Sequence, residues 1–215
     1  GIIYNPELTG FEIKSFDDLW DSRLEGMVSI PEITTTFGPA MVYVAGDHAG
    51  TPVAEDEGKA AFEALAELKP NLVKTYTKSS DLINMFTSGE VAAAVVGDFG
   101  VPTIVAANPD LVYVTPEETY ANFNTINITK NCKNKDLAID FLKSTFAGSV
   151  ELYDNILEST GAIATYLPAG ESEKYAEPVA YWSNQPIFKT IVEYSKQTPA
   201  NNTSPYYYDG RNAIG

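Results

Sequence analysis

Residues 16–46 read FDDLWDSRLEGMVSIPEITTTFGPAMVYVAG, and the order of apolar and turn-forming residues in this stretch decides the fold. An apolar strand is expected over 27–30, and Pro39, a residue favoured at the first position of a helix, opens a helix over 39–46. Between them stand three hydroxyl side chains, Thr34, Thr35 and Thr36. Hydroxyl groups and free amide N–H groups therefore meet where a strand ends and a helix begins, which is where open α/β sheets bind polar ligands.

Strand-like and helix-like segments alternate through the first 130 residues. Apolar strands are expected at 2–5, 27–30, 72–76, 92–96, 111–114 and 123–129. Helices are expected at 16–22, 39–46, 55–68, 80–88 and 99–107, the first of them opened by a capping-box pattern of Ser15 and Asp18. The run VAAAVV at 91–96 is continuously apolar, which indicates a central strand covered on both faces. This alternation predicts an α/β fold with a mostly parallel sheet flanked by helices.

The segment after residue 130 changes character. Helices are expected over 135–146, 150–157 and 187–194, and the loop at 164–186 is rich in Pro, Gly and Tyr. Few strands are expected here. The tail is therefore helical, and its apolar faces must be buried on another surface.

The composition restricts the function. A net charge of −15 argues against binding of nucleic acid, which requires a basic surface. No apolar run reaches the roughly 18 residues of a membrane span. Cys132 and His48 are the only residues of their kinds, and the chain lacks the GxSxG, HExxH and Walker motifs. We predict a binding protein rather than an enzyme, with no catalytic residue, no metal and no cofactor.

Three motifs carry a resemblance to a known family. The pattern S-F-x-D-L-W-D at 15–21, the passage MFTSGEVA at 85–92 and the helix KNKDLAIDFL at 133–142 together resemble bacterial extracellular solute-binding proteins of ABC importers. The resemblance is to the periplasmic-binding-protein type II fold, in its polyamine and iron branch. The stretches STGAI at 159–163 and YWSNQPIF at 181–188 are more similar to the sugar-type branch.

The resemblance implies a layout and a location. Residues 11–120 would form the second, ligand-binding lobe, and residues 1–10 and 121–215 the crossover strands and helices of an incomplete first lobe. We expect a fragment or a join of two receptors, lying outside the cell or in the periplasm and lipid-anchored in its full-length form. Its partners would be a small solute and an ABC permease in the membrane, with no chemical step.

Three groups of residues are expected to converge on the ligand. They are Thr34, Thr35, Thr36 and Phe37 after the strand 27–30, Asp98 and Phe99 after the strand 92–96, and Tyr120, Asn122 and Asn124 on the outgoing crossover strand. Trp182 is a further candidate for stacking on a sugar. Each group could instead have a purely structural role. Asp98 would then cap the following helix, and the aromatic residues would pack against neighbouring strands and helices.

The residue types at these positions bear on the ligand class. The resemblance implies, for a polyamine receptor, an acid near residue 124, a Trp near residue 96 or 97 and a further acid near residues 34–36. This chain has Asn124, Val96 and Gly97, and hydroxyls at 34–36, which favours a sugar or polyol. A polyamine or a ferric ion or anion is the second choice, although Tyr206–Tyr208, read as one strand, cannot all face one metal. A protein-interaction module using the helical tail is the alternative of another class.

Overall fold

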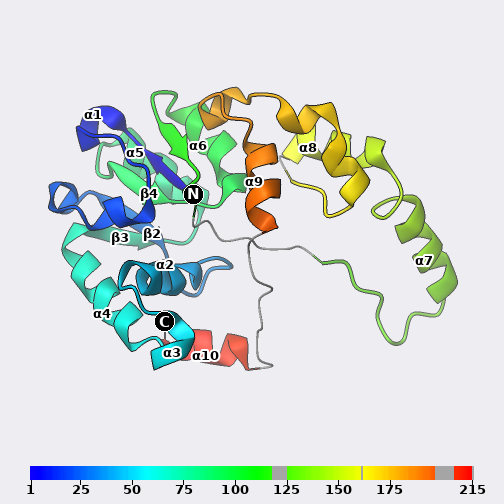
Figure 1. Cartoon of the computed structure of the whole chain (residues 1–215), viewed down its shortest axis with the longest axis horizontal. Helices are drawn as coiled ribbons and strands as arrows, with labels where there is room; N and C mark the ends of the chain where they lie inside the picture. Colours follow the sequence, from blue (N-terminus) through cyan, green and yellow to red (C-terminus); the bar gives the residue numbers. More distant parts are fainter. Residues whose placement is uncertain (118–124, 161, 197–205, 215) are drawn as a thin grey trace. The chain divides into compact units, whose positions relative to one another are not determined.

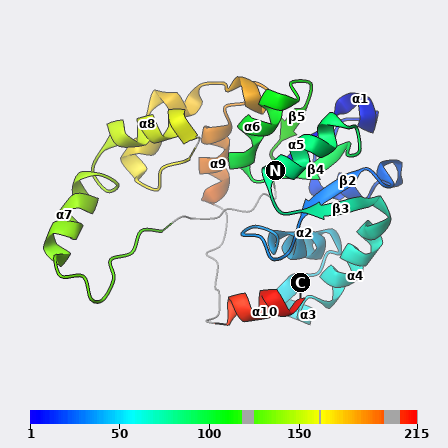
Figure 2. The same ribbon diagram turned by 180° about the vertical axis from the view of Figure 1, so that it is seen from behind.

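The computed structural model describes residues 1–117, 125–160, 162–196 and 206–214. The chain divides into two compact units. Unit 1 comprises Gly1–Tyr120, Ala180–Ser183 and Pro199–Gly215, and unit 2 comprises Ala121–Val179 and Asn184–Thr198. Figures 1 and 2 draw the ribbon from opposite sides.

Unit 1 is built on a five-stranded sheet with the order β3-β2-β4-β1-β5. Its strands are β1 (Ile2–Tyr4), β2 (Val28–Pro31), β3 (Leu72–Tyr76), β4 (Ala93–Val95) and β5 (Val112–Val114). β2 pairs in parallel with β3 and β4, whereas β1 is antiparallel to β4 and to β5. Four strands therefore run in the same direction. The predicted α/β class with a mostly parallel sheet is confirmed, and the fully buried β4 lies in the middle, as its continuous apolar run predicts.

Helices flank this sheet (Figure 1). The α-helices of unit 1 are α1 (Pro6–Thr9), α2 (Ala40–His48), α3 (Val53–Asp56), α4 (Lys59–Leu68), α5 (Ser79–Thr87), α6 (Val101–Ala107) and α10 (Tyr207–Ile214). Short 3₁₀ turns join them: η1 (Phe16–Trp20), η2 (Ser22–Leu24), η3 (Lys69–Asn71), η4 (Asp98–Gly100) and η7 (Ala180–Trp182). Side chains from η1, η2, β2, α2 and α4 form the core beneath the sheet, among them Leu19, Leu24, Val28, Met41 and Leu68. Each such burial contributes about 1.5–3 kcal/mol.

Two helices differ from the sequence-based prediction. The helix expected over 55–68 is divided into α3 and α4, because Glu57 and Gly58 have φ values of 60° and 82° and so interrupt the helix. The helix expected over 16–22 is a pair of 3₁₀ turns. Its predicted start is present, since the Asp18 carboxylate accepts a hydrogen bond from the backbone N–H of Ser15 at 2.9 Å.

Unit 2 is helical. It contains α7 (Lys135–Ser144), α8 (Val150–Thr160) and α9 (Ile187–Ser195), with the turns η5 (Leu167–Glu171) and η6 (Glu173–Ala176). These helices match the three predicted for the tail. Residues 125–129, however, have no regular structure, although the sequence predicts a strand there as part of 123–129.

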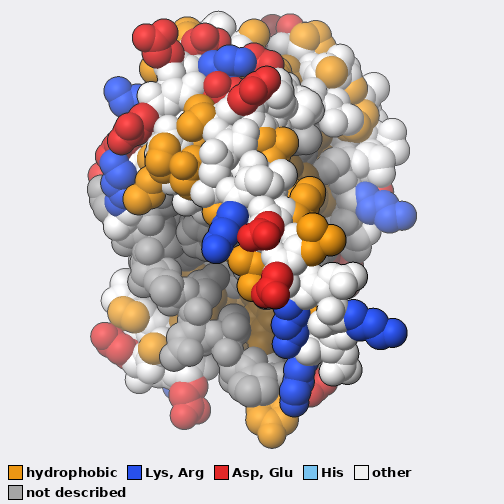
Figure 3. Space-filling model, turned by 90° about the vertical axis from the view of Figure 1, so that its right-hand side faces the viewer, with side chains coloured by type: hydrophobic (Ala, Val, Ile, Leu, Met, Phe, Trp, Pro, Cys, Tyr) orange, Lys and Arg blue, Asp and Glu red, His pale blue; other side chains and the backbone are white. Residues whose placement is uncertain are grey.

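The core of unit 2 is small and rich in aromatic residues. Its buried residues include Tyr153, Leu157, Tyr175 and Phe188. α7 buries no residue, and its Leu137 and Phe141 side chains are 69% and 58% exposed. Figure 3 shows hydrophobic and charged side chains mixed on the face of the molecule that carries α7.

None of the helices in the described part of the chain is long and apolar enough to cross a membrane.

Candidate functional site

The site begins with the direction of the strands. β4 and β5 are both antiparallel to β1, so they run the same way as β2 and β3. The carboxyl ends of these four strands therefore meet at one edge of the sheet, which we call the carboxyl edge. It consists of the β2–α2 loop (residues 32–39), Tyr76 at the end of β3 and residues 97–99 after β4. In open α/β folds this edge is where ligands bind.

Tyr76 ties the strand ends together. Its hydroxyl donates a hydrogen bond of 2.8 Å to the carbonyl of Val95 at the end of β4. Its own carbonyl accepts a bond of 2.9 Å from the N–H of Glu32. Burial raises the pKa of Tyr76 above its ordinary value, because the phenolate would lose its hydration. Through its two hydrogen bonds, Tyr76 links the end of β3 to the end of β4 and to the start of the β2–α2 loop.

The three threonines do not form a common set of free hydroxyls. The Thr35 hydroxyl donates to the carbonyl of Glu32 at 2.7 Å and accepts from the N–H of Gly38 at 3.0 Å, which closes the β2–α2 loop on itself. The Thr34 hydroxyl donates to the Glu32 carboxylate at 3.0 Å. Thr36 alone of the three is exposed. Two of the three predicted ligand groups thus already have partners inside the loop.

Glu32 changes the interpretation of this loop. The sequence predicts hydroxyls in place of an acid near residues 34–36, but the Glu32 carboxylate lies in the same loop and accepts the Thr34 hydroxyl. That prediction did not consider Glu32, which directly follows the last residue of β2, Pro31. The loop folds back, so the acid and the threonines meet. The one sequence feature that could have pointed to Glu32 is its position just after a predicted strand.

Aromatic rings from two loops meet at the edge. The rings of Phe37 and Phe99 are T-shaped, with centroids 5.9 Å apart, and Phe37 also lies 6.5 Å from the ring of Tyr76. Phe99 is 65% exposed. Gly97 makes room for that ring, since a Cβ at residue 97 would lie 2.5 Å from it. The cluster presents an open aromatic face, and such ring pairs contribute about 0.5–1.5 kcal/mol beyond area burial.

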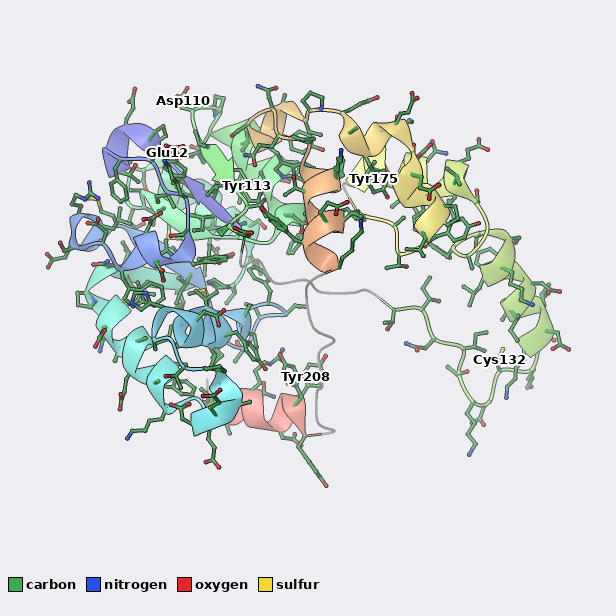
Figure 4. The ribbon with its side chains drawn as sticks, viewed as in Figure 1. Glu12, Asp110, Tyr113, Cys132, Tyr175 and Tyr208 are labelled. Atoms are coloured by element: carbon green, nitrogen blue, oxygen red, sulfur yellow. The ribbon has the colours of Figure 1, made fainter. Side chains whose placement is uncertain are left out.

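Asp98 stands beside Phe99 and is half-buried. Its carboxylate accepts a hydrogen bond of 2.9 Å from the N–H of Phe99. The N-cap of α6 is Gly100, and that of η4 is Gly97, so Asp98 is not the cap that the structural alternative expects. Burial raises the pKa of Tyr113 on β5 (labelled in Figure 4), and the nearby charge of Asp98 raises it further. The Asp98 carboxylate is thus close enough to Tyr113 for its charge to act on that phenol.

Of the remaining predicted ligand residues, Trp182 is the one that the structure describes. Tyr120, Asn122 and Asn124 lie outside the described residues. Trp182 is fully buried in η7, with its ring 4.9 Å from that of Tyr181. η7 packs against α6 and β5, and the adjoining Ser183 hydroxyl accepts the Tyr113 N–H at 3.1 Å. Trp182 therefore has the packing role that the sequence analysis gives as the alternative to stacking on a sugar.

Two further features bear on metal binding. No group of three potential metal ligands occurs among His, Cys, Asp and Glu in the described ranges. The sequence-based reading of Tyr206–Tyr208 as a strand is wrong, because α10 begins at Tyr207. His48 lies at the far end of α2 from the β2–α2 loop, where it contacts Asp17 at 2.7 Å and stacks on Trp20 at 4.0 Å. It is a packing residue.

Comparison with known proteins adds family information. A model of the family described as bacterial extracellular solute-binding protein matches residues 1–184. A lactose-binding protein of Rhizobium radiobacter is 28% identical over 163 residues, which cover 67% of this chain and 38% of that protein. The chain thus spans well under half the length of this relative.

Two solved structures are similar over most of the chain. An ABC transporter structure from Clostridium perfringens ATCC 13124 has a TM-score of 0.74 and 44% identity, and the match covers 92% of this chain and 63% of that one. The spermidine/putrescine ABC transporter substrate-binding protein PotD from Streptococcus pneumoniae also has a TM-score of 0.74, but at 20% identity. That match covers 100% of this chain and 64% of the other, and it supports the fold alone.

Proposed function

The chain belongs to the bacterial extracellular solute-binding protein family, and from this premise we propose that it captures a small polar solute at the carboxyl edge of its sheet. The family supplies the solute-binding components of ABC transporters, which bind and deliver rather than catalyse. Within the proposal, the captured solute passes to the membrane permease of an importer. Closure of two lobes about a hinge would hold it, and a lipid anchor on the full-length protein would keep it outside the cell.

The observation that carries the proposal is the chemistry of the carboxyl edge. The carboxylates of Glu32 and Asp98 only accept hydrogen bonds when ionised. The ring of Phe99 offers an exposed apolar face. A fitting solute therefore presents hydrogen-bond donors together with C–H groups that can lie on a ring. Hydroxyls and ammonium groups are the two common donors of this kind.

A sugar or polyol is the first candidate. Its hydroxyls would donate to Glu32 and Asp98, and the apolar face of its ring would rest on Phe99. The similarity to a relative named as a lactose-binding protein supports this choice. The neutral residues at Val96 and Gly97 are compatible with it, since they add no further charge to the site.

A polyamine is the second candidate, and the specific observation in its favour is Glu32. With Asp98 it places two acids at the carboxyl edge, and carboxylates with aromatic rings suit ammonium groups joined by methylenes. We argue no ferric site, because no group of three His, Cys, Asp or Glu side chains occurs among the described residues to support one.

Calorimetric titration of the chain with lactose, other disaccharides, spermidine and putrescine tests the proposal. Phe99→Ala is expected to weaken binding of a sugar about 2- to 10-fold, the equivalent of about 0.5–1.5 kcal/mol. Phe62→Ala on α4, which removes a 42% exposed phenylalanine ring outside the carboxyl edge, is the control.

Glu32→Gln separates the two candidates. A charged hydrogen bond contributes about 1.5–3 kcal/mol, so an ammonium ligand is expected to lose about 10- to 150-fold in affinity, and a neutral sugar much less. Glu63→Gln on α4 removes the same charge from an exposed site. Absence of binding to every solute, together with tight binding to a protein partner, would instead favour the protein-interaction module.

A further inference from the structure

A contact between the end of the chain and the β2–α2 loop has no role in the function proposed above. Within unit 1, α10 places Arg211 against this loop, and the Nη1 of Arg211 donates to the carbonyl of Thr35 at 3.4 Å. The guanidinium carbon also lies 4.8 Å from the ring centroid of Tyr208 (labelled in Figure 4), a cation–π contact within α10. The contact joins residues 176 positions apart.

A second residue of α10 faces the same part of unit 1. Burial raises the pKa of Tyr207, and smaller effects on it come from Arg211 and from Tyr43 of α2. Tyr207 therefore lies near α2, the helix that the β2–α2 loop leads into. α10 thus contacts the loop through Arg211, and its Tyr207 lies near the helix that follows the loop.

The attachment is weak in a way that suits a releasable latch. A separation of 3.4 Å is long for an N–H···O bond. The Nε of Arg211 is buried and has no hydrogen-bond partner within the described residues, which is unfavourable for a charged group. Arg23, the other arginine for comparison, holds the Asp21 carboxylate at 2.6 Å on the surface. Among the described residues, Arg211 exchanges part of its hydration for one long hydrogen bond and one ring contact.

The contacted residue is the one that organises the loop. The Thr35 hydroxyl closes the turn between Glu32 and Gly38, and Thr34 beside it orients the Glu32 carboxylate. A restraint on the Thr35 carbonyl therefore restrains the direction of Glu32 and of the neighbouring Phe37. Glu32 is a group that we assign to the solute, and Phe37 packs against Phe99, which is another.

From these contacts we infer that Arg211 is a positioning residue, and that α10 is a latch which holds the β2–α2 loop in its solute-binding conformation. The inference rests on the proposed function for its ligand arm. The latch acts by reducing the number of conformations that the loop samples before a solute binds, so its loss lowers affinity without removing any contact to the solute.

Hydrogen–deuterium exchange tests the latch without any ligand. Arg211→Ala is expected to speed exchange in the peptide covering residues 32–39 and to leave α5 (residues 79–87) unchanged. Arg211→Lys keeps the charge but loses the planar fork, and we expect an intermediate rate. Arg23→Ala removes the same charge at a remote surface site and should leave the loop at its wild-type rate. Unchanged exchange in residues 32–39 of Arg211→Ala would overturn the inference.

Titration with the best solute from the screen above tests the positioning role. Arg211→Ala is expected to weaken binding about 3- to 10-fold, whereas Arg23→Ala is expected to bind as the wild type does. Faster exchange in the loop with unchanged affinity would show that α10 restrains the loop without positioning it for the solute, and would overturn the inference. If the wild-type chain binds none of the solutes, the proposed function fails, and the exchange measurement still decides whether the latch exists.

Discussion

The two units of the chain use the same kind of amphipathic helix with different results. In unit 1, the side chains of α2 and α4 join those of η1, η2 and β2 in one core in which Leu19, Leu24 and Leu68 are fully buried. In unit 2, α7 has a clear apolar side, yet none of its residues is buried. An apolar helix face is therefore buried only where another part of the fold packs against it. In unit 1 that part is the sheet.

The sharpest test of this difference removes the same side chain from each unit. Leu19→Ala is expected to lower the free energy of unfolding by about 2–5 kcal/mol, because it deletes buried methyl groups and leaves a cavity. Leu137→Ala on α7, where the side chain is 69% exposed, is expected to change it by no more than about 0.5 kcal/mol.

Urea unfolding can follow both variants by two signals. Trp20 and Trp182, the two tryptophans of the chain, both belong to unit 1, so their fluorescence reports that unit. Far-ultraviolet circular dichroism reports the helices of both units. A loss on Leu137→Ala as large as that on Leu19→Ala would show that α7 is buried in solution, and the contrast between the units would disappear.

The second prediction compares one buried phenol in each unit. Tyr76→Phe removes the donor to the Val95 carbonyl at the carboxyl edge, and we expect a loss of about 1–3 kcal/mol, since that carbonyl is left buried without its partner. Tyr175→Phe in unit 2 removes the acceptor of the Ala164 N–H at 2.9 Å in a partly buried site. We expect about 0.5–1.5 kcal/mol there. Thermal unfolding of the two variants measures the difference, and equal losses would argue against the tighter construction of the carboxyl edge.

The pH dependence of the unfolding free energy gives an independent measurement of how strongly Tyr76 is buried at the carboxyl edge. The folded state raises the pKa of Tyr76 from the ordinary value of 10.0, so the unfolded chain releases this proton first. The stability due to the buried phenol is therefore complete below about pH 10 and is lost as the pH rises further. Tyr76→Phe should show a shallower fall in unfolding free energy above pH 10 than the wild type. Identical slopes would mean that another group, such as the buried Tyr113, accounts for the alkaline loss.

The sequence predicts the frame of unit 1 well because local patterns and local packing agree there. The apolar run at 91–96 becomes the central strand β4. The order of apolar and turn-forming residues in 16–46 correctly predicts a strand, a loop and a helix there. The division between α3 and α4 is not predictable in this way. It depends on the left-handed backbone of Glu57, a conformation that its side chain does not favour.

The candidate site is predictable in position but not in detail. Strand direction alone places Phe37, Asp98 and Phe99 at the carboxyl edge. The partners of Thr34 and Thr35 are set by how the loop closes, so the sequence could not show that Glu32 takes their hydroxyls. Trp182 is buried by β5 and α6, elements about 70 residues away along the chain, and no local pattern reports such a contact.

The smallest expected effect on stability lies at Gly97, where the fit of the carboxyl edge is tested without disturbing the core. A methyl group at residue 97 would lie 2.5 Å from the ring of Phe99, so Gly97→Ala forces that ring to turn. The ring is exposed and can move, and the backbone φ at residue 97 is −72°, which alanine readily adopts. We therefore expect a change in unfolding free energy of less than about 1 kcal/mol.

Binding should respond more than stability. If Phe99 supplies the stacking face, a turned ring removes much of the contribution that Phe99→Ala removes, and the affinity for a sugar should fall about 2- to 10-fold. Gly170→Ala, where an added methyl group meets nothing within 4 Å in unit 2, is the matched control and should bind as the wild type does. Wild-type affinity in Gly97→Ala, with a loss in Phe99→Ala, would mean that the solute uses the ring in its turned position. The stacking face would then form only after the ring has moved, and Gly97 would be needed for the packing of Phe37 and Phe99 rather than for recognition.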